Sequence, residues 1–215
     1  MDNKTWVQAA IDVEDIEVAK RIAYMALDAG AEWLEVGTPL LYQYGHSAIR
    51  MIRNAVGKDA VLVADYKTAI GGLCAEQAAR EGADYILLSA GYNNYLIKDS
   101  IDVAQRIGIT PIFDLNVRPQ DVKACANTIT KLGGKYLFAH HYADFVDADG
   151  ELSRFDILDN LVSGDRDYKL GITSDIFEEA EDAAKYADWI VFGVVLREPN
   201  PVSCKQWIDM IHSAR

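Results

Sequence analysis

Short apolar runs alternate with amphipathic segments along the chain, and this alternation restricts the possible folds more than any other feature. The apolar runs predict strands at Trp6–Ile11, Glu32–Val36, Ala60–Asp65, Tyr85–Ser89, Thr110–Asp114, Tyr136–His140, Tyr168–Ile172 and Trp189–Phe192. Helical patterns fall at Val13–Ala29, Gly45–Val56, Gly72–Glu81, Leu96–Arg106, Pro119–Leu132, Phe155–Val162, Ser174–Tyr186 and Val202–Ser213. Strands that alternate with helices form parallel sheets. The pattern therefore predicts the α/β class and, specifically, a (β/α)8 TIM barrel.

The chain length agrees with a single barrel domain over residues 1–215, because such barrels commonly run to roughly 200–250 residues. An open doubly wound sheet is the second choice. It is less favoured because the chain has neither a Gly-x-Gly-x-x-Gly nor a Gly-x-x-x-x-Gly-Lys-Ser/Thr motif. No linker or low-complexity tract divides the sequence.

The charge balance excludes some classes of partner. The chain carries 21 Lys and Arg against 33 Asp and Glu, for a net charge of −12, and it has no basic cluster. Nucleic acid is not an expected partner, since binding to phosphates needs concentrated positive charge.

Three widely spaced cysteines predict a reduced cytoplasmic protein. No run approaches the ~18 apolar residues of a spanning helix, so no membrane partner is expected.

Polar residues stand where the predicted strands end. Asp65 and Lys67 lie two residues apart at the end of the third strand, so their side chains should share one face. The other polar residues at strand ends are Asp12, Glu35, Thr38, Asp114, Asn116, His140 and His141. In a barrel these ends converge on one mouth, where active sites lie. Oxygen ligands such as Glu35 and Asp65 suit Mg²⁺ or Mn²⁺, which would offset the cost of clustered charge.

Simpler interpretations stay open at this point. Asp65 and Lys67 form an ordinary ion pair in one of them. Asp12 and Glu35 cap the helices that follow them in another. One of His140 and His141 is then a core residue and the other is exposed. The segment from Tyr142 to Ser153 is expected to be a lid or substrate loop, and its Asp147–Gly150 run does not complete a calcium loop.

Three motifs together resemble one known family. They are Val7–Asp12, Glu35–Leu40 and Val63–Lys67, which in order and spacing resemble the orotidine 5′-phosphate decarboxylase superfamily. The Glu-Val-Gly-Thr-Pro run is most similar to the branch of 3-keto-L-gulonate 6-phosphate decarboxylase and D-arabino-hex-3-ulose 6-phosphate synthase. The resemblance implies a magnesium-dependent homodimeric barrel that stabilises an enediolate, formed by decarboxylation or by aldol cleavage.

The resemblance also implies roles for individual residues. Glu35 and Asp65 would bind the metal, and Lys67 would stabilise negative charge on the enediolate oxygen. Asp12 would hold Lys67 or a substrate hydroxyl, Asp114 would contact substrate, and His140 would deliver a proton. The substrate-binding residues would be Thr38, Thr173, Ser174, Gly193 and Arg197.

The chain also departs from the family pattern. Ile70 replaces the last acid of the third-strand signature, which in the family reaches the site of the other subunit. Where relatives carry a Gly-Gly pair after the seventh strand, this chain has Ile172-Thr173-Ser174-Asp175. Where they have Gly-Arg or a glycine-rich turn after the eighth, it has Phe192-Gly193-Val194-Val195. Asp175 would repel a phosphate and Val194 offers no charge, whereas Arg197, one helical turn after Val194, is a candidate substitute. An arginine that sometimes follows the sixth-strand histidine is Ala143 here.

These comparisons lead to a leading hypothesis with alternatives. The half of the site that forms the enediolate is retained, whereas the half that holds phosphate is rebuilt. We therefore expect a metal-dependent lyase that decarboxylates a 3-keto sugar acid. This substrate need not be phosphorylated. An aldolase similar to hexulose-6-phosphate synthase and an isomerase or epimerase share the same metal and Lys67. A catalytically retired barrel that binds a sugar or metabolite is favoured by Ile70 but disfavoured by the retained Glu35, Asp65 and Lys67.

Overall fold

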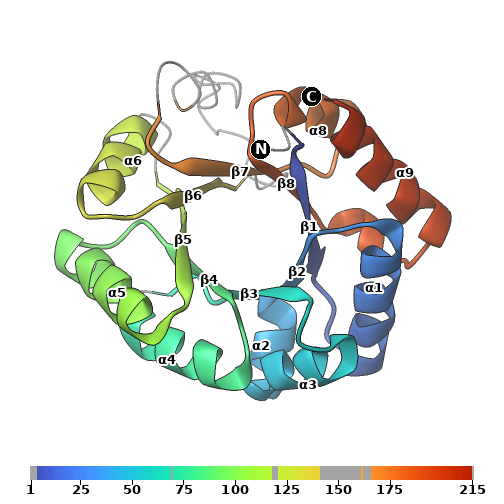
Figure 1. The fold of residues 1–215 in the computed structure, drawn as a ribbon, viewed down its shortest axis with the longest axis horizontal. Coiled ribbons are helices and arrows are strands. Elements are labelled where there is room, and N and C mark those ends of the chain that lie inside the picture. Colours follow the sequence, from blue (N-terminus) through green and yellow to red (C-terminus); the bar gives the residue numbers. More distant parts are fainter. Residues whose placement is uncertain (1–3, 69, 118–120, 141–160, 162–165, 215) are drawn as a thin grey trace.

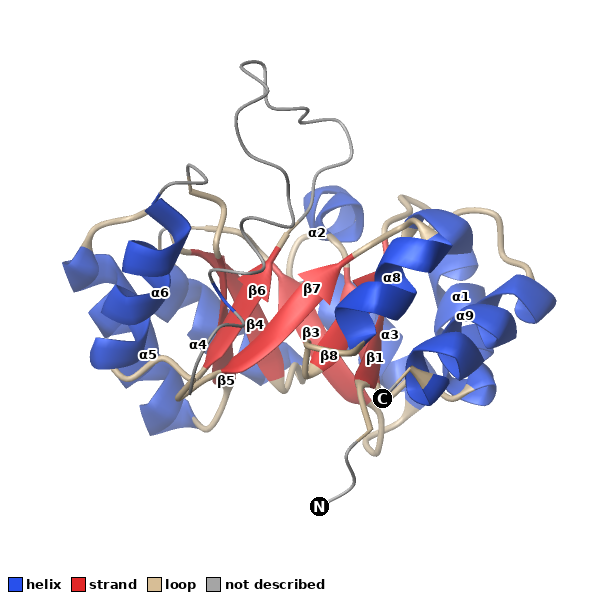
Figure 2. Cartoon of the chain, turned by 90° about the horizontal axis from the view of Figure 1, so that it is seen from above, coloured by secondary structure: helices blue, strands red, loops and turns tan. Residues whose placement is uncertain are grey.

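Eight parallel strands form a closed barrel with the helices outside it (Figure 1, Figure 2). The computed structural model describes residues 4–68, 70–117, 121–140, 161 and 166–214. The strands are β1 (Trp6–Ile11), β2 (Trp33–Val36), β3 (Val61–Asp65), β4 (Tyr85–Ser89), β5 (Thr110–Asp114), β6 (Tyr136–Ala139), β7 (Lys169–Thr173) and β8 (Trp189–Phe192). Each pairs with its neighbour in sequence, and β8 pairs with β1. The TIM barrel prediction is confirmed.

Helices follow the strands along the described part of the chain. They are α1 (Ile16–Ala29), α2 (Thr38–Tyr44), α3 (Ser47–Val56), α4 (Gly71–Glu81), α5 (Asn94–Ile107), α6 (Val122–Lys131), α8 (Phe177–Ala184) and α9 (Pro201–Ser213), with the 3₁₀ helix η2 at Val194–Leu196. The helix expected over Phe155–Val162 falls outside the described residues except for Leu161. None of these helices is long and apolar enough to cross a membrane.

Local signals explain where the helices begin and end. The side chain of Asp15 accepts hydrogen bonds from the amides of Glu17 and Val18 at the start of α1, and Gly30 ends the helix in the left-handed region with φ 108°. Asn93 caps α5 in the same way, so this helix begins two residues earlier than expected. The short helix α2 was not predicted, although Pro39 in its first turn is a usual start signal.

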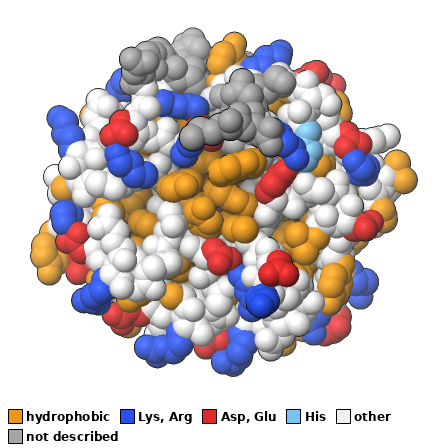
Figure 3. Space-filling model, viewed as in Figure 1, with side chains coloured by type: hydrophobic (Ala, Val, Ile, Leu, Met, Phe, Trp, Pro, Cys, Tyr) orange, Lys and Arg blue, Asp and Glu red, His pale blue; other side chains and the backbone are white. Residues whose placement is uncertain are grey.

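The interior of the barrel is filled by large rings. Trp33 stacks on Tyr85 with ring centroids 4.5 Å apart, and it lies 5.3 Å from Trp189. A Cβ atom at Gly171 would lie 2.0 Å from the ring of Trp189, so only glycine leaves room for it. Hydrophobic side chains are visible at the centre of the face in Figure 3, inside the ring of strands. This packing leaves the carboxyl ends of the strands as the place for polar side chains.

Candidate active site

Asp65 at the end of β3 is the centre of the polar cluster. One of its carboxylate oxygens, Oδ2, forms a salt bridge with Nζ of Lys67 and accepts a hydrogen bond from Oγ1 of Thr38 at 2.7 Å. The other oxygen, Oδ1, is buried and has no hydrogen-bond partner in the described structure. Asp65 itself is 1% exposed. The sequence prediction that Asp65, Lys67 and Thr38 lie together is therefore confirmed, and one buried carboxylate oxygen remains available for a ligand.

The backbone of Lys67 adopts an uncommon conformation. Its φ of 45° is the one positive value among the described residues other than glycine. Its amide and that of Tyr66 both donate to the carbonyl oxygen of Leu87, at 3.0 and 3.2 Å. A left-handed conformation at a residue with a Cβ costs free energy and is often found at functional sites. The side chain of this lysine lies against Asp65, with Nζ in a salt bridge to Oδ2.

Lys67 is held in its charged form. Burial by itself would lower the pKa of Lys67, but the carboxylates of Asp65 and Glu35 outweigh this effect and raise the pKa above its usual value. The amine is therefore a fixed cation at neutral pH. A cation held in this way is suited to stabilising negative charge that develops on a substrate oxygen.

Glu35 lies inside the barrel next to this pair and is 4% exposed. Its Oε2 accepts a hydrogen bond from the side-chain amide of Gln8 on β1. Burial, and then the charge of Asp65, raises the pKa of Glu35 well above its ordinary value, while Lys67 acts in the opposite direction. Two like charges at short range in a buried site favour a bound cation.

Asp12 follows β1 and fits against two glycines. A Cβ atom at Gly37 would lie 2.2 Å from Oδ1 of Asp12, and one at Gly193 would lie 3.3 Å from its Oδ2. Burial and the charge of Asp65 raise the pKa of Asp12, and Lys67 and Arg197 lower it. The capping alternative for Asp12 and Glu35 is wrong, since Asp15 caps α1 and no side chain caps α2.

Asp114 and His140 form a second pair at the mouth, from β5 and from the end of β6. Nδ1 of His140 lies 3.6 Å from Oδ2 of Asp114. Asp114 is fully buried, and neither of its oxygens has a hydrogen-bond partner in the described structure. Burial raises the pKa of Asp114 to about 7. His141 and the expected loop from Tyr142 to Ser153 lie outside the described residues.

The polar residues fit a magnesium or manganese ion in part. Glu35 and Asp65 offer carboxylate oxygens, and the unpartnered Oδ1 of Asp65 is of the right kind. Among the described residues, no three His, Cys, Asp or Glu side chains form a group that could hold a metal ion. Mg²⁺ usually takes one or two carboxylates and completes its shell with water and substrate oxygens. The donor set is compatible with such an ion but not with a cage made of protein alone.

The ends of β7 and β8 hold the remaining predicted residues. Thr173 is 9% exposed, and its hydroxyl has no hydrogen-bond partner in the described part of the chain. The hydroxyl of Ser174 is engaged locally, since it contacts the backbone of Ile176 and lies 3.4 Å from Oε2 of Glu179. Arg197 is exposed and acts on Asp12 electrostatically. Of the five predicted substrate-binding residues, Ser174 is thus the one whose side chain forms its contacts with residues at the start of α8.

Two contributors to this site were not predicted as such. Gln8 lies on β1, two residues before Ala10 and four residues before Asp12. Side chains alternate with a period of two along a strand, so Gln8 points to the inner face with these two residues. Asp175 accepts hydrogen bonds at its Oδ1 from the amides of Gly193 and Val194, at 2.9 and 2.8 Å. The alternation could have identified Gln8, whereas the contact of Asp175 depends on the packing of two loops.

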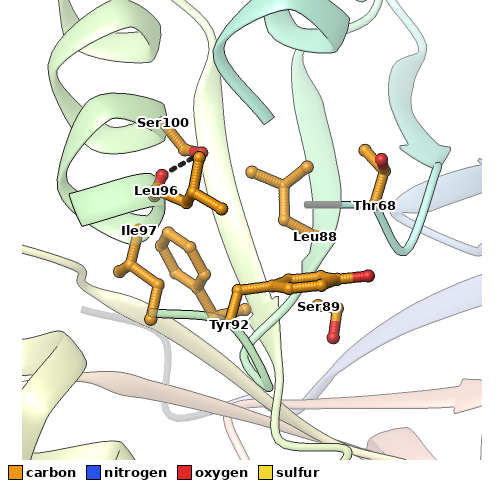
Figure 4. A pocket seen from close by; sticks show the side chains of 8 residues that line it. Thr68, Leu88, Ser89, Tyr92, Leu96, Ile97 and Ser100 are labelled. Atoms are coloured by element: carbon orange, nitrogen blue, oxygen red, sulfur yellow. Dashed lines mark hydrogen bonds between the residues drawn. The ribbon is translucent and has the colours of Figure 1, made fainter. Parts of the chain in front are cut away.

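A separate hollow lies between β4 and α5 (Figure 4). Thr68, Leu88, Tyr92 and Ser100 are among its lining residues. The hydroxyl of Ser100 donates to the carbonyl oxygen of Leu96 at 2.7 Å. None of the predicted site residues lines this hollow, so the polar cluster at the mouth is the candidate active site.

Known proteins are similar to this chain in sequence and in fold. A family model described as the orotidine 5′-phosphate decarboxylase / HUMPS family matches residues 5–203. The bifunctional enzyme Fae/Hps of Methanocella arvoryzae is 39% identical over 114 residues, which cover 52% of this chain and 28% of that protein. The match thus spans less than a third of that relative's length.

Solved structures of other proteins superpose on nearly the full length of this chain. The 3-hexulose-6-phosphate synthase from Salmonella typhimurium superposes with a TM-score of 0.83 at 21% identity, and covers 96% of this chain and 98% of its own. The 3-keto-L-gulonate-6-phosphate decarboxylase from Vibrio cholerae has a TM-score of 0.80 at 22% identity, with coverage of 97% and 98%. These two likenesses concern the fold. Because the family model matches most of the sequence, the chain belongs to the orotidine 5′-phosphate decarboxylase / HUMPS family, as its motifs indicated.

Proposed function

We propose that this protein is a metal-dependent carbon–carbon lyase of carbohydrate metabolism that forms an enediolate, and that it decarboxylates a 3-keto sugar acid. The observation that carries the proposal is the position of Lys67. It is a partly buried cation beside Asp65 and Glu35, on the barrel mouth where a substrate oxygen can approach. A cation placed where charge develops lowers the barrier to forming an enediolate.

Glu35 and Asp65 are the residues that would hold Mg²⁺ or Mn²⁺. When bound there, the ion would supply positive charge to two adjacent substrate oxygens. Thr38 fixes the orientation of the Asp65 carboxylate through its 2.7 Å hydrogen bond, and Gln8 does the same for Glu35. Asp12 lies where it can orient Lys67 or accept a hydrogen bond from a substrate hydroxyl.

Asp114 and His140 are the candidates for proton transfer. Loss of carbon dioxide leaves a carbanion equivalent whose carbon must receive a proton. The pKa of Asp114 is raised to about 7, which is suitable for exchanging protons at neutral pH, and His140 lies 3.6 Å away. We assign the delivery of the proton to His140, with Asp114 beside its ring and in contact with substrate.

An aldolase is the second candidate function. Relatives by sequence and by structure carry the names Fae/Hps and 3-hexulose-6-phosphate synthase. Cleavage or formation of a carbon–carbon bond next to the same enediolate needs the same metal ligands and Lys67. A retired binding barrel is the third, supported by Ile70, which is 56% exposed in place of an acid.

The deciding experiment follows exchange of a carbon-bound substrate proton with deuterium by NMR. The panel contains keto sugars and keto acids with and without a phosphate, first with magnesium and then with a chelator. We expect exchange that depends on magnesium, is absent in Lys67→Ala and persists in Lys98→Ala, whose lysine forms an exposed pair with Asp102. A folded protein that binds a panel member without any exchange would instead support the binding barrel.

The protein is also proposed to be a cytoplasmic homodimer. Ile70 and Leu73 at the start of α4 are 56% and 54% exposed, and Tyr92 and Tyr95 near the start of α5 are 43% and 76% exposed. The helices α4 and α5 pack together, so these side chains gather at one end. Exposed apolar groups of this kind often mark an interface. The three cysteines are free thiols, which fits a reducing compartment. A wild-type protein that sediments as a monomer at every concentration would exclude the dimer.

A further inference from the structure

The carboxylate of Asp175 binds two backbone amides at the mouth of the barrel. Its Oδ1 accepts from the amide of Gly193 at 2.9 Å and from that of Val194 at 2.8 Å. Asp175 follows β7, and the two amides follow β8, where the short helix η2 begins. In TIM barrels the loops after these two strands, with the start of a short extra helix, frequently bind the phosphate of a substrate. Here an anion that belongs to the chain itself lies on these amides.

The charges around this position oppose a second anion. Asp12 and Asp175 are close enough that the charge of Asp175 raises the pKa of Asp12. Val194 is 48% exposed and offers no charge. Arg197 acts favourably on Asp12, so its positive charge is already opposed by a carboxylate. A phosphate would have to displace Asp175 from both amides or lie beside two carboxylates with one exposed arginine to offset them.

The same region offers a hydrogen-bond partner for a neutral group of the substrate, the hydroxyl of Thr173. The hydroxyl of Thr173 is nine-tenths buried, has no hydrogen-bond partner in the described structure, and lies on the strand face that Gly171 presents to the barrel interior. A hydroxyl can both donate and accept, so it suits the hydroxyl of a sugar. An unpartnered buried hydroxyl costs free energy unless a ligand supplies its hydrogen bond.

We propose that Asp175 determines specificity, by occupying the amides of Gly193 and Val194 in place of a phosphate and so selecting a substrate with an uncharged, hydroxyl-bearing end. The substrate is then an unphosphorylated keto sugar or keto sugar acid. This inference rests on the proposed function for the reacting end of the substrate, but the exclusion of phosphate stands on the contacts of Asp175 and the charges beside it.

The test uses the intact protein with magnesium and follows the ¹⁵N amide signals of Gly193 and Val194. The probes are inorganic phosphate, D-ribulose and D-ribulose 5-phosphate. In the wild type, phosphate leaves both amides unshifted, and D-ribulose binds at least as tightly as its phosphate ester. In Asp175→Gly the amides are released, and affinity for the ester rises by about tenfold or more, because each bond from an amide to a charged group contributes strongly.

Asp175→Asn is the matched variant, because its amide oxygen still accepts from Gly193 and Val194. We expect a smaller gain in affinity for the ester than in Asp175→Gly. The proposal is overturned if phosphate shifts the two amides in the wild type, or if Asp175→Gly gains no affinity for the ester. Where the glycine variant does not fold, the wild-type titration decides. Failure of the lyase proposal is read separately, from the deuterium exchange of keto sugars, and leaves this titration unaffected.

Discussion

The side-chain amide of Gln8 donates a hydrogen bond to Oε2 of Glu35 inside the barrel. Both side chains are buried, so the contact fixes the carboxylate that we assign to the metal. Replacement by Met removes the hydrogen bond and keeps the volume. We expect Gln8→Met to weaken magnesium binding by about 10-fold to 100-fold, the usual effect of losing a group that orients a ligand.

Isothermal titration with magnesium measures this change. Ser100→Ala is the control, because it removes another buried polar side chain that lies on α5 and does not contact the cluster. Both variants should lose some stability, but Ser100→Ala should keep its affinity for magnesium. Equal affinities in Gln8→Met and the wild type would show that Glu35 needs no such support or does not hold the ion.

The left-handed backbone at Lys67 predicts a difference between two inactive variants. Lys67→Gly and Lys67→Ala both lose the amine and leave Asp65 without its cation. At a φ of 45°, however, alanine carries a Cβ penalty that glycine avoids. We expect Lys67→Gly to be more stable than Lys67→Ala by about 1 kcal/mol in urea unfolding.

Thr68 provides the comparison, since its φ is not positive. There the order should reverse, with Thr68→Ala more stable than Thr68→Gly. If glycine is no better than alanine at position 67, the strain is absent in solution. The strained lysine would then not be a device that points the amine at Asp65.

Gly37 leaves room for the carboxylate of Asp12. A Cβ atom there would lie 2.2 Å from Oδ1 of Asp12 and 2.6 Å from the carbonyl oxygen of Ile11. Backbone cannot move aside easily, so Gly37→Ala should destabilise the protein by about 1–3 kcal/mol and displace Asp12. Gly193→Ala is the milder partner, because its nearest neighbours would be 3.2 and 3.3 Å away. Chemical denaturation of both, with the exchange assay beside it, checks the order.

The sequence predicts most of the barrel because its strands are buried on both faces. Such strands read as continuous apolar runs, and the expected and observed ends differ by one residue at most, as at β7, where Tyr168–Ile172 became Lys169–Thr173. Asp65 and Lys67 were placed together by local spacing alone, since they lie two residues apart. Features fixed by neighbouring residues could therefore be predicted.

Contacts between distant segments could not be predicted in the same way. The bond from Gln8 to Glu35 needs the register of β1 against β2, in which Ala10 lies beside Glu35. Asp175 was expected to repel a phosphate, but its contact with amides 18 and 19 residues away depends on how the two loops pack. The helix α2 was missed because its seven residues are too few to show a clear period.

Asp114 gives the protein a specific dependence of stability on pH. Burial raises its pKa from 3.8 to about 7, so the folded state favours the neutral acid. This stability is fully present below the unfolded pKa near 4 and is lost as the pH rises through about 7. The side chain in Asp114→Asn stays neutral at every pH. The free energy of unfolding of this variant relative to the wild type should therefore increase by up to about 4 kcal/mol between pH 4 and pH 7, and then level off.

Urea unfolding with chelator at a series of pH values measures this gain. Asp15→Asn is the matched control, because Asp15 is an exposed cap whose pKa is lowered by hydrogen bonds from the amides of Val18 and Glu17. Its carboxylate is favoured in the folded state, so asparagine there should bring no gain at alkaline pH. A constant difference between Asp114→Asn and the wild type across the series would mean that Asp114 titrates near its ordinary pKa. In that case it could not exchange protons with His140 near neutral pH, and the proton delivery assigned to this pair would have to be withdrawn.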